Sequence, residues 1–163
     1  MTSSARLFAI GALVIALAGC APEGVTAAAG PPPTPDMVWT AKVSGAGTGL
    51  ILAPPGGDPV FSLACVRGTR EVLAIVETVK PIGSEDRLSL GFGDLIVAFV
   101  VKPQALKEGR ILEAGAKIQP ELLAAIRTAA EIRGSYGATR IGPYPAPPKA
   151  LVDPFVARCG PLI

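Results

Sequence analysis

The sequence contains no histidine among its 163 residues, and this absence narrows the chemistry open to the protein. Without histidine the chain cannot form a Ser-His or Cys-His catalytic pair, and it lacks the side chain that most often binds transition metals. A Ser-Lys nucleophile would remain, but no Ser-x-x-Lys motif stands in a helical pattern. We therefore expect neither an enzyme nor a protein with a metal or cofactor site.

Aromatic residues and unbalanced charge are scarce as well. The chain has 5% aromatic and 50% hydrophobic residues, so its core must rest on Val, Ile, Leu and Ala. It carries 15 basic and 13 acidic side chains, a formal net charge of +2, and the two signs are interspersed. A nucleic-acid-binding surface would need a concentrated basic patch. The sequence therefore predicts no nucleic-acid partner.

Two short segments could be mistaken for binding motifs. Segment 44–49, SGAGTG, has three alternate glycines, but the sixth position counted from Gly45 is Leu50 and a strand is expected after it in place of a helix. It therefore favours a hairpin turn over a dinucleotide fingerprint. Segment 143–148, PYPAPP, contains a P-x-x-P pattern that a recognition domain could bind. Its composition is more typical of an extended, stiff connector ahead of the last helix.

The N-terminal residues have the layout of a secretory signal peptide. Arg6 precedes an apolar run, 7–18, and small residues lead to Cys20. The run is about a dozen residues, whereas a helix needs roughly 20 to span a bilayer. The ending Leu17–Cys20, with the sequence LAGC, resembles the lipobox of bacterial lipoproteins.

This resemblance implies cleavage before Cys20 and attachment of acyl chains, such as palmitate, to its sulfur and new amino group. Several acyl chains together anchor a protein stably in a membrane. The next residue is Ala21 rather than an aspartate, which in the sorting rule of the family implies the outer membrane. We therefore expect residues 1–19 to be a signal peptide and the mature protein to be a lipid-anchored envelope protein facing the periplasm.

The domain organisation follows from composition. Residues 20–35 comprise Cys20 and a segment rich in Pro, Ala and Gly that has almost nothing to fill a core, so we interpret them as a tether. Residues 36–163 are long enough for a single globular domain.

Most of the domain has the period of two that is typical of strands. Between Val38 and Val101, short alternating runs are separated by turn residues such as those of 55–59 and 81–86. The segment LIVAFVVK, 95–102, is apolar on both faces, which predicts a central strand. Residues 131–142 alternate again and predict a further strand with a bend.

The period changes to that of a helix at Pro120. Apolar residues then recur on one helical face as far as residue 130. A final short helix or pair of turns is expected over KALVDPFVARC, 149–159. The fold class predicted from these patterns is α+β, with an antiparallel sheet closed in a sandwich- or barrel-like manner, two short helices and one disulfide.

The predicted disulfide joins Cys65 to Cys159. If Cys20 carries lipid, these two are the remaining cysteines of a secreted chain. Cys65 shares a strand face with Phe61, and Cys159 lies four residues beyond Phe155 on a helix, so both sulfurs should point inward. A redox role is disfavoured, because neither cysteine has a C-x-x-C partner or a histidine.

A contact surface is predicted around Tyr136, Arg140 and Tyr144, because tyrosine and arginine are enriched in protein interfaces. The leading interpretation is a non-enzymatic lipoprotein that binds an envelope protein partner or supports an assembly. From FSLAC to FVARC the chain resembles small alphaproteobacterial lipoproteins that have no assigned activity. The alternative is an inhibitor of a hydrolase, since SLACVRG resembles the opening of membrane-bound lysozyme inhibitors. Their late tryptophan-containing segment has no counterpart here, because the only tryptophan is Trp39.

Overall fold

The computed structural model describes residues 36–162 of the chain. Nine strands form one antiparallel sheet in the order β1-β2-β3-β4-β7-β6-β5-β8-β9. The strands are β1 (Val38–Ser44), β2 (Gly47–Ala53), β3 (Phe61–Val66), β4 (Glu71–Val76), β5 (Arg87–Phe92), β6 (Leu95–Val101), β7 (Leu112–Lys117), β8 (Glu131–Tyr136) and β9 (Thr139–Pro145).

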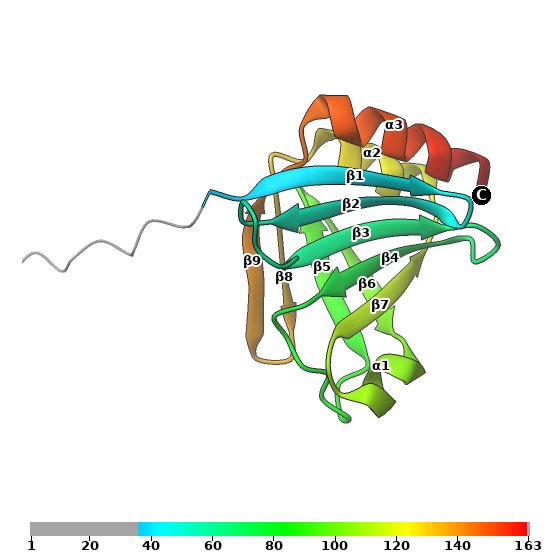
Figure 1. Cartoon of the computed structure of the whole chain (residues 1–163). Coiled ribbons are helices and arrows are strands. Elements are labelled where there is room, and N and C mark those ends of the chain that lie inside the picture. The colour runs from blue at the N-terminus through cyan, green and yellow to red at the C-terminus, as the bar shows by residue number, and fades with distance from the viewer. Residues whose placement is uncertain (1–35, 163) are drawn as a thin grey trace, which may run out of the picture. The chain divides into compact units, whose positions relative to one another are not determined.

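Three helices and a 3-10 turn complete the fold. They are α1 (Pro103–Glu108), α2 (Pro120–Thr128), α3 (Lys149–Cys159) and η1 (Gly160–Leu162). The sheet curls strongly, and α2 and α3 lie side by side at one end of it, with α3 next to β1 (Figure 1). The short helix α1 lies at the opposite end, between β6 and β7 (Figure 1).

The curl brings the first and last strands of the sheet together at one corner. The indole nitrogen Nε1 of Trp39 in β1 donates a hydrogen bond of 2.9 Å to the carbonyl of Pro145 in β9. Phe61 of β3 lies between Trp39 and Tyr144. It is edge-on to Trp39, and it is stacked on Tyr144 with the centroids of these two rings 5.1 Å apart. An aromatic cluster therefore packs the corner where the two edge strands meet.

The core lies between the inner face of the sheet and the two long helices. Alternate strand residues such as Leu50, Leu63 and Leu88 are fully buried, and they pack with Ile126 of α2 and Phe155 of α3. This alternation is the period of two seen in the sequence. The prediction of an antiparallel sheet with helices and one disulfide is confirmed, and closure of the sheet into a sandwich or barrel stays a prediction.

The elements differ from the sequence-based expectation in three places. Helix α1 and strand β7 are not predicted, so the helices number three among the described residues rather than two. Residues 131–145 form a hairpin of two strands, β8 and β9, instead of one bent strand. The connector expected at 143–148 begins inside β9, since Tyr144 pairs with Ile132. The helix at Pro120 and the final helix at 149–159 are confirmed.

Candidate binding groove on the outer face of the sheet

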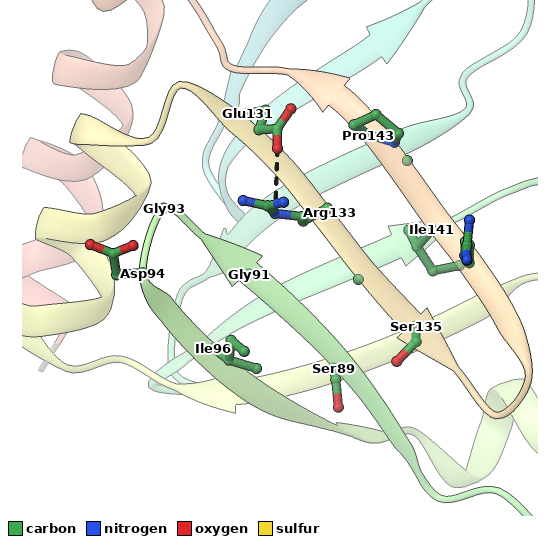
Figure 2. A pocket seen from close by; sticks show the side chains of 13 residues that line it. Ser89, Gly91, Gly93, Asp94, Ile96, Glu131, Arg133, Ser135, Ile141 and Pro143 are labelled. Atoms are coloured by element: carbon green, nitrogen blue, oxygen red, sulfur yellow. Dashed lines mark ion pairs between the residues drawn. The ribbon is translucent and has the colours of Figure 1, made fainter.

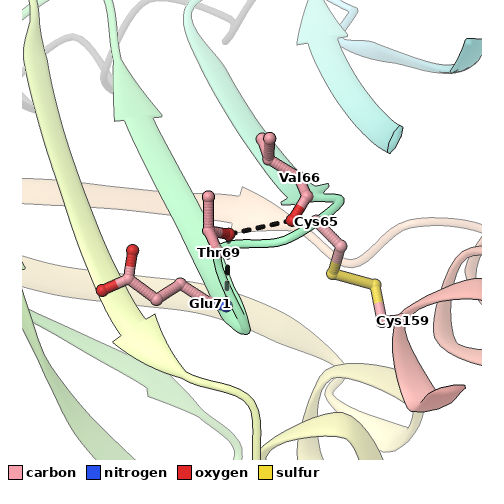
Figure 3. Close-up of a disulfide and its surroundings, with 5 residues drawn as sticks. All are labelled: Cys65, Val66, Thr69, Glu71 and Cys159. Atoms are coloured by element: carbon pink, nitrogen blue, oxygen red, sulfur yellow. Dashed lines mark hydrogen bonds between the residues drawn. A yellow bond between two sulfur atoms is a disulfide. The ribbon is translucent and has the colours of Figure 1, made fainter. Parts of the chain in front are cut away.

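The predicted disulfide is confirmed, and it fastens α3 to the sheet. Cys65 of β3 and Cys159 of α3 are both fully buried, with Cα atoms 5.7 Å apart (Figure 3). At the end of the same strand, Thr69 closes the β3–β4 turn by donating a hydrogen bond of 2.9 Å from its hydroxyl to the Val66 carbonyl. The Cys65–Cys159 disulfide is therefore a structural link in the core rather than an exposed redox site.

The prediction that Tyr136 belongs to a contact surface is wrong. Tyr136 is fully buried on the inner face of β8. Its hydroxyl accepts a hydrogen bond of 2.9 Å from the Ile82 backbone N–H and donates one of 2.8 Å to the Glu85 carbonyl. A buried tyrosine hydroxyl needs such partners, and here it ties the 81–86 loop to the sheet.

Tyr144 also faces the interior, at the aromatic corner. It is half-buried, and its ring stacks on Phe61. Burial raises the pKa of the Tyr144 hydroxyl above its ordinary value, while a hydrogen bond with Thr78 opposes that rise. Of the three predicted contact residues, Arg140 alone lies on the exposed outer face of the sheet. The structure therefore does not bring the three together at one surface.

Arg140 lines a groove of about 830 Å³ on the outer face of β5, β8 and β9. Its floor is made of small residues, Ser89 and Gly91 from β5 and Ser135 from β8 (Figure 2). Ile96 of β6 forms part of one wall (Figure 2). The small floor residues leave a depression because the neighbouring side chains on the same face are longer.

The opposite wall depends on an irregularity in β9. Ile132 pairs with Tyr144 and Gly134 with Ile141, so Gly142 and Pro143 together face Arg133 in a β-bulge. Gly142 has a φ of 74°, a left-handed conformation that suits glycine. The bulge sets the ring of Pro143 along the groove (Figure 2).

The charges of the groove are mixed. Glu131 and Arg133, two residues apart on β8, form an ion pair of 3.3 Å (Figure 2). Asp94 lies in the β5–β6 turn at one end, and Arg140 lines the other side. Among the described residues, Arg140 takes part in none of the ion pairs. Its guanidinium is thus available to a ligand.

An exposed apolar stripe adjoins the groove on β6. Ile96 is 75% exposed and Val100 is 58% exposed, the highest values among the large hydrophobic side chains of residues 36–161, and exposed Ala98 lies between them. The sequence predicts β6 as a central strand, and its place between β7 and β5 confirms this. Its inner face is packed in the core, whereas the apolar side chains Ile96 and Val100 on its outer face are exposed.

No cluster of three or more His, Cys, Asp or Glu side chains that could hold a metal ion occurs in the described part of the chain. None of its helices has the length and apolar character needed to cross a membrane. Cys20 and the predicted signal peptide and tether, 1–35, lie outside the described residues.

The groove itself is missed by sequence reasoning, although parts of its signal are present. Small residues at alternate positions of two strands, Ser89 and Gly91 in one and Ser135 in the other, can mark a depression. Their alignment depends on the pairing of β5 with β8, which are far apart in the chain.

No family model matches this chain, and no curated protein or solved structure matches it either.

Proposed function

We propose that this protein is a non-enzymatic lipoprotein of the cell envelope, anchored through lipid on Cys20, that captures a protein partner in the groove of its outer sheet face. The observation that carries the binding role is the juxtaposition of the exposed stripe, Ile96 and Val100, with the groove. Contiguous exposed apolar surface at the edge of a hollow is typical of interaction sites.

The scaffold suits such a role. The groove lies on hydrogen-bonded strands whose inner face is packed against the core, so its walls are preorganised and binding orders few additional groups. The proposal also treats the curled sheet as barrel-like, a description supported by the hydrogen bond between Trp39 and Pro145. The lipobox at Leu17–Cys20 supports the anchoring part, and it favours the outer membrane with the domain in the periplasm.

Anchoring is tested by Cys20→Ser. The variant should lose incorporation of an alkyne fatty acid and leave the membrane fraction, because the sulfur that would carry the lipid is gone. The Cys65→Ala, Cys159→Ala variant serves as the matched control and should still be labelled. Equal labelling of wild type and Cys20→Ser would refute lipidation at this residue.

Partner capture is tested by crosslinking and pulldown of the acylated protein from its native envelope. Ser89→Phe fills the groove floor without altering the strand, whereas Thr40→Phe places the same bulk on the exposed outer side of β1. We expect the first variant to lose the captured partner and the second to keep it. Recovery of a hydrolase that the protein inhibits would instead support the alternative function, an inhibitor of an enzyme such as lysozyme. Capture unaffected by Ser89→Phe would remove the groove from the function.

A further inference from the structure

One row of small side chains crosses the sheet and ends at Arg140. In the strand register Ala98 of β6 faces Ser89 of β5, Ser89 faces Ser135 of β8, and Ser135 faces Arg140 of β9. Directly opposed residues in neighbouring antiparallel strands lie on the same face of the sheet. These four residues therefore form a continuous line on the outer face, and we call it the cross-strand row.

Larger side chains flank the cross-strand row on both sides. Ile96 and Arg133 lie on one side, with Gly91 between them, and Val100 and Arg87 form an opposed pair on the other. Gly91 widens the row toward the bulge of β9, which is where the groove is hollowed. The row is thus the bottom of a trough that runs across the strands instead of along them.

The length of the trough matches a short extended chain. Three steps between neighbouring strands, each about 4.8 Å, separate Ala98 from Arg140 by about 14 Å. An extended peptide rises about 3.3 Å per residue, so about four residues span that distance. The side chains of Ala98, Ser89 and Ser135 are short enough for a peptide backbone to lie against them.

The two ends of the trough differ in chemistry. At the β6 end Ala98 lies between the exposed side chains of Ile96 and Val100, which offer apolar contact. At the β9 end stands the guanidinium of Arg140, a planar fork of donors that matches a carboxylate. Arg133 in the groove is already paired with Glu131, and Arg87 at the flank of the row is paired with Asp86. Net attraction for an anion is therefore concentrated at Arg140.

We propose, building on the function proposed above, that the trough binds an extended segment of a partner protein in which an Asp or Glu side chain lies about four residues from a branched aliphatic one. The carboxylate is held by Arg140, and the aliphatic side chain packs between Ile96 and Val100. Charge complementarity selects this occupant. Among residues 36–162 no aromatic ring lines the groove, so the described part of the chain gives it no platform for stacking sugar rings or bases. Asp94 and Glu131 give it as many acidic as basic groups, which disfavours an anionic lipid surface.

The test pans a random phage-displayed heptapeptide library against the acylated protein in nanodiscs. Selected sequences should be enriched in Asp or Glu about three to five positions from Val, Ile or Leu. Each selected peptide is synthesised with an amidated C-terminus, so that only side-chain carboxylates remain. We expect Arg140→Glu to weaken binding about tenfold or more, and a peptide with Lys in place of the acid to regain binding to that variant.

Arg110→Glu is the matched control, since it makes the same change of charge at an exposed residue outside the groove. It should leave binding within about twofold of wild type. Selection of peptides without acids, no selection at all, or equal loss with both variants would overturn the proposal. Selection of proline-rich sequences like PPPTP would assign the trough to the chain's own segment 31–35 instead. A partner capture that is lost with Ser89→Phe but unchanged with Arg140→Glu would retain the proposed function and reject this ligand.

Discussion

The two halves of the sheet are built for different tasks. The first half, β1 to β4 with β7, is fastened to α3 by the Cys65–Cys159 disulfide. The second half consists of β6, β5, β8 and β9. Its inner face buries Tyr136, and its outer face carries the groove. The halves join where Val100 and Val101 of β6 pair with β7, and they meet again at the corner where Trp39 of β1 bonds to Pro145 of β9. In an antiparallel sheet alternate residues face opposite sides, so one strand can hold the core and present a binding surface.

Removing the disulfide should cause the largest loss of stability, because this bond holds the first half of the sheet and α3 together. The Cys65→Ala, Cys159→Ala variant opens a loop whose ends are 94 residues apart. The chain-entropy treatment gives about 4 to 5 kcal/mol for a loop of that size. Thermal unfolding followed by circular dichroism should show a strongly lowered melting temperature. Cys20→Ser, which spares the bond, should melt like wild type, and equal melting of all three proteins would contradict the fastening role.

Two glycines in the paired strands β5 and β8 of the second half should respond differently to replacement by alanine. A Cβ added to Gly134 would lie 2.1 Å from the Ser89 carbonyl oxygen, whereas one added to Gly91 would meet its nearest atom at 3.5 Å. Because a backbone atom must move, we expect Gly134→Ala to lower the free energy of unfolding by about 3 kcal/mol. Gly91→Ala should stay within about 0.5 kcal/mol of wild type. Urea titration measures both, and similar losses would contradict the register of β5 and β8.

Removing the hydroxyl of Tyr136 should lower the free energy of unfolding by a smaller amount. Tyr136→Phe keeps the ring but leaves the Ile82 N–H and the Glu85 carbonyl without their partner. We expect a loss of about 1 to 2 kcal/mol in the free energy of unfolding, together with faster amide exchange in the 81–86 loop. Tyr144→Phe is the control, since Tyr144 is only half-buried. A loss as large in that variant would mean that the loop contacts are not the cause.

The smallest effect concerns the contact between the two long helices. Asp153 of α3 lies 2.7 Å from Nζ of Lys149 and 3.1 Å from Nε of Arg127 in α2. The hydrogen bond from Lys149, with help from the charge of Arg127, lowers the pKa of Asp153 below its ordinary value of 3.8. Because the folded-state pKa is the lower one, the stabilisation is present above pH 3.8 and is lost as pH falls through the folded-state value.

Asp153→Asn should therefore be slightly less stable than wild type near neutral pH and equal to it in strong acid. Urea titrations at several pH values check this convergence. The difference in stability between wild type and Asp153→Asn should also shrink in high salt, because Asp153, Lys149 and Arg127 are partly exposed. A difference that stays constant with pH would show that the carboxylate charge is not responsible.

The sequence was sufficient where a pattern is local. The helical period after Pro120 predicts α2, and the remaining cysteine pair predicts the bond between Cys65 and Cys159. Tyr136 could have been placed correctly as well, because the alternation from Ile132 puts both side chains on the inner face. The enrichment of tyrosine in interfaces suggested a surface role, yet backbone groups of the 81–86 loop satisfy the hydroxyl of Tyr136 inside the fold.

The features that need long-range information were not predictable. An apolar run such as 95–102 looks the same whether both faces of a strand are covered or one is left open, because the covering elements come from elsewhere in the chain. The outward exposure of Ile96 and Val100 therefore depends on both long helices packing on the inner face. Likewise, Ser89 and Arg140 are joined in one row only by the register of four strands.

The disulfide also makes the domain a covalent ring that contains everything from β4 to α3. A protease that cuts once inside this ring, for instance after the exposed Arg67 or Arg70 in the β3–β4 turn, cannot separate the two fragments. The piece that begins at the proposed anchor would stay linked to the piece that carries the groove until the bond is reduced. A singly nicked protein would therefore remain at the membrane with its groove attached, and it would run as two bands only on a reducing gel.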